Sequence, residues 1–532
     1  MKEITELKFE ELSVEQKLGL VHIICVNGWV RRSKPELDTI LLNLIKNHAL
    51  GGVWVQPDTP DAQEIIDMVK EAADYPILLF TDAESGIKTK DIEYLVGKHN
   101  AIGCTDSELH AYTFGKVIGV TARKMGYNIV CDPLLDISTT GSARSLGSDK
   151  TKIAKLAAAE AKGFHDAGIL TVGKHYPSAI NHKQIDSHMA ESESLQTKEE
   201  LLEYSLYAYK ELMKEDLLDG LMSAHIRCPK IDPDNPASLS KKVIDVIRDE
   251  GYDGLILTDA LCMMGILAKY GYDVSRGLAI AAGNDMALPY DSKFQESYDA
   301  LIKCYNEGMI SDERLDEAVK RVLAAQKKTM QSAKYDEITE EDLKIFRSIN
   351  KDAVTAKFDE GLSANISRDG KHYFVLMVRN EEKVGGDGGV AVDTFSNGWL
   401  YPNEVIEQIQ EYFPNSTVKC IHQFPTQGQC HNTVSYSIDY DDVIFITFSE
   451  FLAYCGREHL TRRVEGLIEA MQLTDRISTL VHFGNPCVLS NLPHISRYLF
   501  APTSRESVAA AIDVLAGEYP ANGKLTYDIK LN

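Results

Sequence analysis

An aspartate at the end of an apolar run is the first residue of this sequence that suggests chemistry. Residues 255–258, Leu-Ile-Leu-Thr, lead directly into Asp259. Such a run is typical of a buried parallel strand, and catalytic groups collect at the carboxyl ends of the strands of a barrel. A carboxylate held there can attack a substrate carbon and form a covalent bond. Asp259 is therefore the candidate nucleophile.

The second candidate group is the pair formed by Asp186 and His188, about seventy residues before Asp259. A carboxylate beside an imidazole fixes the tautomer of the ring and raises its basicity. A histidine prepared in this way is suited to general acid and base chemistry near neutral pH. A carboxylate nucleophile together with a proton donor favours cleavage of glycosidic bonds.

The elements that must position these residues follow a regular rhythm of apolar strand, polar turn and amphipathic helix over about the first 330 residues. We expect strands at 21–25, 52–56, 77–82, 128–132, 170–175, 220–225, 255–259 and 285–288. Helical stretches such as 150–166 and 198–215 lie between them. Eight strand-helix units predict a (β/α)8 barrel.

A second set of strands follows a charged helical stretch. We expect these strands at 373–378, 417–422, 443–447, 478–483 and 498–501, with helices such as 404–412 and 457–472 between them. The α/β chain is thus predicted to contain a TIM-type barrel at 1–335, a helical connector at 336–355 and a C-terminal α/β sandwich domain at 356–532.

Length and composition agree with two globular domains and limit the classes of molecule that the protein is expected to bind. A chain of 532 residues exceeds the roughly 250–300 residues that one core supports. The net charge of −23 disfavours nucleic acid or an anionic membrane as a partner, since both need a basic surface. A small carbohydrate fits better. The oligomeric state is left open.

The sequence also bears on the compartment. It shows no secretory leader and no run of about 20 apolar residues, so we expect a cytoplasmic protein. Its ten cysteines lack the spacing of a metal site, so we expect them to be reduced. We expect no metal or cofactor.

Several charged residues stand where the predicted barrel strands end, which is where catalytic residues of such barrels lie. They are Asp82, Asp132, Lys174, His175 and His225. Asp132 precedes a proline and is more simply interpreted as the cap of a turn. His225 fits a hydrogen-bonded rim residue as well as it fits a substrate ligand.

Five motifs, in their order and spacing, resemble the N-terminal domain of glycoside hydrolase family 3, and most closely its β-N-acetylglucosaminidase branch. The resemblance covers about residues 10–330. The motifs are Asp82-Ala83-Glu84-Ser85-Gly86, Ala143-Arg144-Ser145-Leu146-Gly147, Gly173-Lys174-His175-Tyr176-Pro177, Asp186-Ser187-His188 and Leu257-Thr258-Asp259-Ala260.

The resemblance implies a role for each matching residue. Asp259 would be the nucleophile of a retaining, exo-acting enzyme, and His188, paired with Asp186, would be its acid and base. The residues implied to grip the sugar are Asp82, Arg144, Lys174 and His175. The substrates implied are small saccharides with a terminal β-linked N-acetylglucosamine, such as cell-wall or chitin fragments.

The chain departs from the family pattern at two places. Residues 178–182, Ser-Ala-Ile-Asn-His, stand where the family usually has a Gly-His-Gly run, so the acid/base loop is expected to move or close differently. Ile87 and Lys88 occupy the place of a usual arginine, which bears on the substrate preference.

The C-terminal region offers weaker candidates. Glu450 and Glu458 are alternative acids, because other branches of the family take a glutamate from the second domain. Residues 385–389, Gly-Gly-Asp-Gly-Gly, lack the pattern of a phosphate-binding loop and are expected to form a flexible turn.

Three alternative functions stay open. A neutral imidazole repels an anionic acceptor less than a carboxylate would, which makes a β-N-acetylglucosaminide phosphorylase the nearest alternative. A β-glucosidase of the same family is the second. A sugar-binding barrel without activity is the third, and it is disfavoured because Asp259 and the Asp186–His188 pair are both present.

Overall fold

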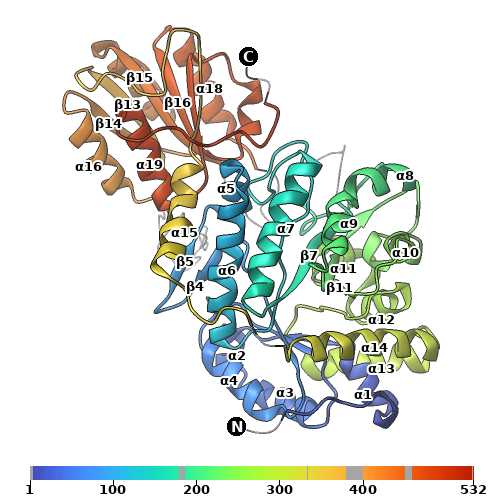
Figure 1. The fold of residues 1–532 in the computed structure, drawn as a ribbon. Coiled ribbons are helices and arrows are strands. Elements are labelled where there is room, and N and C mark those ends of the chain that lie inside the picture. Colours follow the sequence, from blue (N-terminus) through green and yellow to red (C-terminus); the bar gives the residue numbers. More distant parts are fainter. Residues whose placement is uncertain are drawn as a thin grey trace. The chain divides into compact units, whose positions relative to one another are not determined.

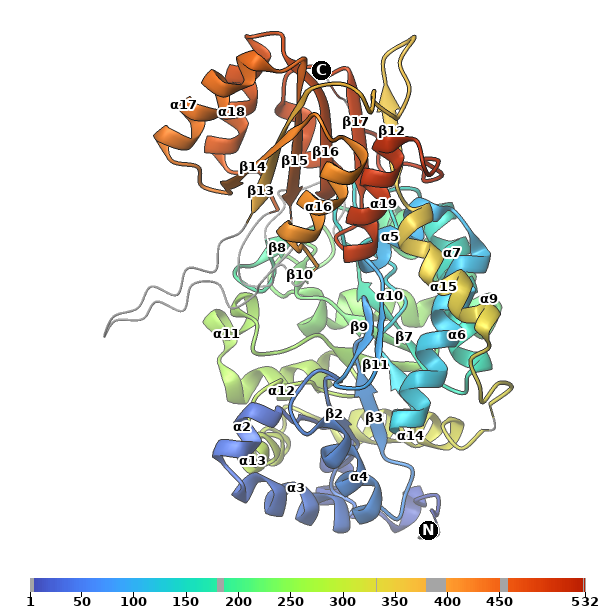
Figure 2. The same ribbon diagram turned by 90° about the vertical axis from the view of Figure 1, so that its left-hand side faces the viewer.

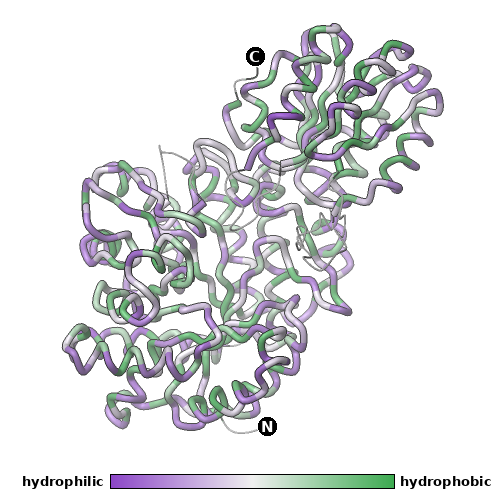
Figure 3. Tube along the Cα trace, turned by 180° about the vertical axis from the view of Figure 1, so that it is seen from behind, coloured by the Kyte–Doolittle hydropathy of each residue, from purple (hydrophilic) through white to green (hydrophobic). Residues whose placement is uncertain are grey.

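The computed structural model describes residues 4–178, 186–331, 333–378, 399–449, 458–529 and 531. The chain divides by its contacts into two compact units. The first consists of Met1–Leu95, Ser107–Thr139 and Asp149–Phe346. The second consists of Val96–Asp106, Thr140–Ser148 and Arg347–Asn532. Figure 3 shows hydrophobic residues along the central strands of each unit and many hydrophilic residues on the helices and loops outside them.

The first unit is built on a parallel sheet with the strand order β1-β2-β3-β6-β7-β9-β11. These strands are β1 (Ile23–Cys25), β2 (Gly52–Trp54), β3 (Leu78–Thr81), β6 (Ile129–Val130), β7 (Leu170–Tyr176), β9 (Gly220–Ser223) and β11 (Leu255–Thr258). Nearly every residue in them is buried, as expected when both faces of a parallel strand are covered. The (β/α)8-like fold class is therefore confirmed.

The eighth predicted strand, 285–288, is present only as single bridges. Met286 pairs with Leu257 of β11, and Ala287 pairs with His22 beside β1, so this segment closes the sheet into a ring. Backbone hydrogen bonds join the segment to both neighbours. The Thr258 N–H donates to the carbonyl oxygen of Met286 at 3.1 Å, and the Ile23 N–H donates to the carbonyl oxygen of Ala287 at 3.0 Å. The segment lies where the sequence predicted the eighth strand, but each neighbour pairs with a single residue of it, so the prediction of a regular strand over 285–288 was wrong in length.

Helices cover the outside of this sheet (Figure 1). The main ones are α1 (Val14–Leu20), α3 (Glu36–Lys46), α4 (Ala62–Ala72), α6 (Glu108–Met125), α7 (Lys150–Asp166), α9 (Tyr207–Lys214), α10 (Lys241–Asp249), α12 (Tyr272–Ala282), α13 (Phe294–Asn306) and α14 (Asp312–Lys328). Helix α7 has the bounds expected from the sequence, because Asp149 caps it by accepting the N–H groups of Thr151 and Lys152. The stretch predicted as one helix at 198–215 is instead α8 (Lys198–Glu200), a π-turn (Leu201–Ser205) and α9.

Short strands and helices lie in the loops that follow the carboxyl ends of the barrel strands. Strands β4 (Gly86–Lys88) and β5 (Glu93–Leu95) form an antiparallel hairpin directly after β3. Gly86 has φ +99°, and a Cβ atom there would lie 1.9 Å from the carbonyl oxygen of Tyr94, so only glycine fits this turn. Strands β8 (Ser192–Glu193) and β10 (Ile226–Arg227) form a second small pair. Helix α2 (Gly28–Ser33) follows β1, and α11 (Met264–Tyr270) follows β11.

The second unit is an α/β sandwich around a six-stranded sheet with the order β12-β17-β16-β15-β13-β14. The strands are β12 (Thr355–Phe358), β13 (His372–Val378), β14 (Thr417–His422), β15 (Asp442–Ser449), β16 (Ile477–Gly484) and β17 (Arg497–Ala501). All pair in parallel except β12, which the sequence rhythm did not reveal and which pairs antiparallel with β17 at the sheet edge.

Helices lie on both faces of this second sheet (Figure 2). They are α16 (Pro402–Tyr412), α17 (Gln427–Tyr436), α18 (Arg462–Gln472) and α19 (Arg505–Ala516). Helix α18 begins later than the predicted residue 457, because Thr461 caps it by accepting the N–H of Val464. Helix α15 (Glu340–Asp352) lies in the predicted connector and crosses the division between the units. The domain boundaries at 335 and 355 stay a prediction.

Two short segments from the barrel part of the sequence belong to the second unit. One contains α5 (Lys98–Thr105), and the other is the loop 140–148. Hydrogen bonds with the C-terminal end of the chain hold the loop. The Ser148 N–H donates to the carbonyl oxygen of Thr526 at 3.0 Å, and the Tyr527 hydroxyl donates to the carbonyl oxygen of Ser142. The pattern of strands and helices in the sequence did not predict that these two segments belong to the second unit.

Candidate active site at the carboxyl ends of the barrel strands

Asp259 follows the last residue of β11 and lies at the carboxyl end of the first unit's sheet. Its backbone N–H donates to the carbonyl oxygen of Ser223 at the end of β9, at 3.0 Å. Its Oδ1 accepts the N–H of Ala260 at 2.7 Å. The side chain is 20% exposed, so the strand delivers a partly accessible carboxylate to the rim.

Histidines surround this carboxylate and keep it ionised. The Nε2 atom of His175 lies 4.0 Å from Asp259 Oδ2. Burial acts to raise the pKa of Asp259, but the neighbouring imidazoles of His175 and His225, the N–H of Ala260 and the imidazole of His188 outweigh it, and the net pKa is below the ordinary value. An aspartate in this setting carries its charge across the physiological pH range.

Asp136 orients His175, and the sequence did not single it out. His175 Nδ1 lies 2.7 Å from Asp136 Oδ2, and the backbone N–H of His175 donates to Asp136 Oδ1 at 3.3 Å. A bond through Nδ1 turns Nε2 toward Asp259. The available signal was an apolar pair, Leu134-Leu135, that ends in a carboxylate. Leu134 bridges Lys174 of β7, so this segment runs beside the strand that carries His175.

We expect His175→Gln to move the acidic limb of the pH profile of kcat/KM to higher pH. The positive charge near Asp259 would be lost, its pKa would rise, and the ionised nucleophile would therefore form only at higher pH. His48→Gln is the matched control, because His48 also pairs with an aspartate, Asp74, at 2.8 Å. If kcat/KM fell but the acidic limb did not move, the prediction would be wrong, and His175 would contact the sugar without lowering the pKa of Asp259.

His225 is a hydrogen-bonded rim residue. It is buried, with Nδ1 2.8 Å from the Ser238 hydroxyl and Nε2 2.9 Å from the carbonyl oxygen of Ala260. Burial lowers the pKa of His225, and its contacts with Asp259 and Ala260 only partly oppose this shift. A neutral ring that donates through Nε2 therefore fixes Ala260, whose N–H in turn holds Asp259.

Lys174 and Asp82, predicted to act on the same ligand, meet directly. Lys174 Nζ lies 2.5 Å from Asp82 Oδ1 and 2.8 Å from Glu84 Oε1. Burial acts to lower the pKa of Lys174, but the carboxylates of Asp82, Glu84 and Asp132 raise it well above its usual value. Asp82 is 34% exposed, while Glu84 is mostly buried. Glu84 lies within the predicted motif, yet its role as a partner of Lys174 was not foreseen.

Asp132 fixes the turn after β3. It is fully buried, and its Oδ2 accepts the N–H of Ala83 at 3.0 Å. Gln56, beyond the end of β2, donates to Asp82 Oδ2 at 3.3 Å. Together these bonds set the direction of the Asp82 carboxylate, whose exposed oxygens are suited to accept hydroxyl hydrogen bonds.

Lys174→Met should destabilise the first unit by about 3 kcal/mol, since it leaves Asp82 and Glu84 without their buried counter-charge. Lys88→Met is the matched control, because Lys88 pairs with Glu93 at 2.9 Å while both side chains are exposed. Differential scanning calorimetry would show a large drop of Tm for the first variant and a small one for the second. Equal drops would mean that the buried cluster adds nothing to stability.

The Asp186–His188 pair forms as the sequence suggested. Asp186 Oδ1 lies 2.7 Å from His188 Nδ1 and accepts the His188 N–H at 2.9 Å. Asp186 is buried and His188 is partly exposed. The Met264 N–H donates to the carbonyl oxygen of His188 at 2.9 Å, which ties this turn to the start of α11. Asp186 thus orients the ring through Nδ1, and the role of His188 in proton transfer stays a prediction.

The remaining candidates belong to the second unit or fall outside the described residues. Arg144 belongs to the loop 140–148 of the second unit, and its role stays a prediction. Glu458 is largely buried in that unit, where its Oε1 accepts the N–H of Ala143 at 3.4 Å. Residues 179–185, with the departure from the Gly-His-Gly run, Glu450 and the glycine-rich stretch 385–389 lie outside the described residues.

Two findings bear on the broader expectations. The nine cysteines in the described part of the chain all have free thiols. Burial raises the pKa of the Cys25, Cys131 and Cys228 thiols. Across the residues that the structure describes, every helix is too short or too polar to span a membrane.

Comparison with known proteins gives a family-level match. The profile of the glycosyl hydrolase family 3 N-terminal domain matches residues 11–325. A β-N-acetylglucosaminidase/β-glucosidase of Cellulomonas fimi is 27% identical over 334 residues, which are 59% of this chain and 57% of that protein. A β-hexosaminidase of Idiomarina loihiensis is 30% identical over 237 residues, which are 42% of this chain and 71% of that protein.

Solved structures resemble the whole chain in fold. A family 3 β-N-acetylglucosaminidase from Paenibacillus sp. has a TM-score of 0.78 and 23% identity, covering 98% of this chain and all of that one. A β-glucoside phosphorylase has a TM-score of 0.80 and 23% identity, covering 98% of this chain and 95% of that one. At this identity the likeness shows the fold, and it extends over both units.

Proposed function

Since the chain belongs to glycosyl hydrolase family 3, we propose that it is a retaining, exo-acting β-N-acetylglucosaminidase that removes terminal N-acetylglucosamine from small saccharides. One observation carries the proposal. A partly exposed Asp259 carboxylate, held ionised by histidines that include His188, stands at the catalytic end of the barrel. That is the pair of groups that a retaining glycosidase requires.

In the first step, an Asp259 oxygen forms a bond to the anomeric carbon while the bond from that carbon to the leaving oxygen breaks. The leaving oxygen takes the proton from His188 Nε2. Asp186 stabilises the ring through Nδ1 both before and after the transfer. The product of this step is a glycosyl ester on Asp259 and a free alcohol.

In the second step, His188 Nε2 takes a proton from water as the water oxygen attacks the anomeric carbon and the ester bond to Asp259 breaks. The sugar leaves with its original configuration after two inversions. In this proposal Asp82, Lys174, His175 and Arg144 bind the sugar. The exposed oxygens of Asp82 accept hydroxyl groups, and the buried Lys174 keeps that carboxylate charged and fixed.

Phosphate is the acceptor to be tested against water. A neutral imidazole at the base position repels a phosphate anion less than a carboxylate would. If phosphate accelerates turnover and the sugar is released as its 1-phosphate, phosphorolysis replaces hydrolysis in this proposal while the roles of Asp259 and His188 stand.

We expect aryl β-N-acetylglucosaminide to be a far better substrate than the matching aryl β-glucoside. A site that hydrogen-bonds the acetamido group leaves polar groups unpaired when the group is missing. The names of the two curated relatives support this preference, although one of them also names β-glucosidase activity. The measurement is kcat/KM for both aryl glycosides with and without phosphate. A preference for the glucoside would reject the substrate and leave Asp259 as the nucleophile.

The proposed setting is the cytoplasm, because cysteines kept as thiols suit a reducing compartment. Cell-wall or chitin fragments taken up by the cell would then be the source of the saccharides.

A further inference from the structure

Tyr290 is an exposed aromatic residue at the carboxyl ends of the barrel strands. It follows the segment 285–288, which bridges in parallel to β11 on one side and to His22 beside β1 on the other. The Leu261 N–H donates to the carbonyl oxygen of Leu288 at 2.9 Å, so the chain just before Tyr290 is bound to the chain just after Asp259. Tyr290 is 38% exposed, and it therefore presents apolar surface on the side of the barrel that carries the proposed nucleophile.

The backbone of Tyr290 has a conformation that large residues rarely adopt. Its φ is +55°, in the left-handed region, where a bulky side chain meets a steric penalty that glycine does not. The next residue holds this conformation, since Asp291 Oδ2 lies 2.5 Å from Nη2 of the buried Arg276 and Asp291 Oδ1 accepts the N–H of Lys293 at 2.9 Å. Backbone strain that the surrounding structure maintains is concentrated at functional sites. A tyrosine kept at this position therefore points to a use for its side chain.

The ring of Tyr290 reaches past the end of β1 to β2. Its centroid lies 6.2 Å from that of Trp54, the last residue of β2, and the two ring planes make an angle of 74°. Trp54 is buried and stacks on Phe80 of β3, with 6.2 Å between the ring centroids. Edge-to-face contacts between aromatic rings are favourable, so the packed Trp54 gives the Tyr290 ring a defined position.

The hydroxyl end of Tyr290 is engaged by the protein. Burial raises the pKa of this hydroxyl, Cys25 and Asp82 raise it further, and a hydrogen bond with Gln56 partly opposes the shift. Gln56 also donates to Asp82 Oδ2 at 3.3 Å, so it links Tyr290 to the carboxylate that is proposed to hold the sugar hydroxyls. Because the hydroxyl is occupied in this way, the apolar ring is the part of the side chain that remains for a ligand.

We propose that Tyr290 is a specificity-determining residue whose ring packs against the C–H face of the sugar that Asp82 holds through its hydroxyl groups. A pyranose carries hydroxyl groups around its edge and C–H groups on its faces. A carboxylate at the edge and an aromatic ring on one face can therefore bind one sugar together. The proposal rests on the sugar site of the proposed function and adds a contact on the face of the ring.

Tyr290→Ala and Tyr290→Gly separate the role of the ring from that of the backbone. Both remove the ring, but only glycine also removes the penalty of the left-handed backbone, so Tyr290→Gly should have the higher Tm. Each should raise KM for an aryl β-N-acetylglucosaminide by about tenfold or more, because an apolar contact is lost, while kcat changes by less than about threefold. Tyr290→Phe keeps the ring and should stay within about threefold of the wild-type KM.

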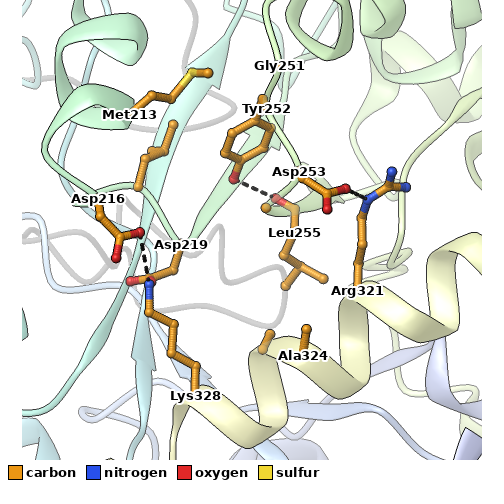
Figure 4. Close-up of a pocket in the computed structure, with 13 residues that line it drawn as sticks. Met213, Asp216, Asp219, Gly251, Tyr252, Asp253, Leu255, Arg321, Ala324 and Lys328 are labelled. Carbon is orange, nitrogen blue, oxygen red and sulfur yellow. Dashed lines mark hydrogen bonds and ion pairs between the residues drawn. The ribbon is translucent and has the colours of Figure 1, made fainter.

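Asp216 provides the matched control. It also has a left-handed backbone, with φ +54°, and it lies just before β9, at the end of the barrel strands away from Asp259. Its exposed side chain pairs there with Lys328 at 3.4 Å (Figure 4). Asp216→Gly should likewise have a higher Tm than Asp216→Ala, but both should keep the wild-type KM.

Isothermal titration calorimetry with N-acetylglucosamine gives a second readout that does not depend on turnover. The Kd should rise by about tenfold or more in both Tyr290→Ala and Tyr290→Gly. If the wild type bound the sugar but turned over no aryl glycoside, the proposed function would fail, while the Kd values would still decide the role of Tyr290. A wild type that neither bound nor turned over the sugar would overturn both.

Three results would overturn the proposal for Tyr290 alone. The first is a wild-type KM and Kd in Tyr290→Gly. The second is a recovery of KM and Kd from alanine to glycine that follows the rise in Tm, because the residue would then act only through stability. The third is a loss in Tyr290→Phe as large as that in Tyr290→Ala, because the hydroxyl and not the ring would then be the sugar contact.

Discussion

Asp259→Asn is expected to lower kcat by at least about four orders of magnitude, because no neighbouring group can form the covalent bond to the anomeric carbon. The fold should survive. An asparagine at this position can still accept the Ala260 N–H, and the backbone bond to Ser223 does not involve the side chain. The measurement is kcat on an aryl β-N-acetylglucosaminide, with Tm as the check on folding.

Asp253→Asn is the matched control for this change, since Asp253 lies just before the other end of β11 and its side chain is exposed. It should keep wild-type kcat. Activity of folded Asp259→Asn within tenfold of wild type would reject Asp259 as the nucleophile.

His188→Ala should have the second largest effect, and its size should depend on the leaving group. Turnover of a disaccharide should fall by roughly 10²–10⁴-fold, because its leaving oxygen needs a proton. An activated aryl glycoside, whose leaving group departs without protonation, should lose far less in the first step. The measurement is kcat/KM over a series of aryl glycosides that differ in leaving-group pKa.

Asp186→Ala should give a weaker form of the same pattern, because the His188 ring would keep its proton-transfer atom but lose the carboxylate that orients it. An equal loss for all leaving groups would show that His188 does not supply the proton. If Glu450→Ala produced the leaving-group pattern instead, the acid would come from the C-terminal region.

The apolar runs predicted most of the barrel because a strand covered on both faces must be apolar along its whole length. That reasoning located β3, β7, β9 and β11, and with them Asp82, Lys174, His175 and Asp259. At 285–288 it predicted a regular strand where the structure has only single bridges, from Met286 to Leu257 and from Ala287 to His22. Hydrophobic periodicity gives the place of a strand but not the number of residues that pair.

The site residues that the sequence did not reveal act through other side chains. Asp136 is defined by its bonds to His175, and Glu84 by its ion pair with Lys174. Each partner lies far away in the chain, so neither pairing follows from local spacing. The same holds for the loop 140–148, whose membership of the second unit depends on bonds to Thr526 and Tyr527. Motif resemblance identified Arg144 within this loop but not the unit that carries it.

Trapping of the glycosyl-enzyme tests the central claim most directly. Incubation with a 5-fluoro analogue of an N-acetylglucosaminyl fluoride slows the second step more than the first, so the covalent intermediate accumulates. Mass spectrometry of the intact chain and of its peptides then locates the label. The account predicts one added sugar on the peptide that contains Asp259, and none in Asp259→Asn. A label on another residue, or turnover that yields the inverted anomer without a covalent intermediate, would contradict it.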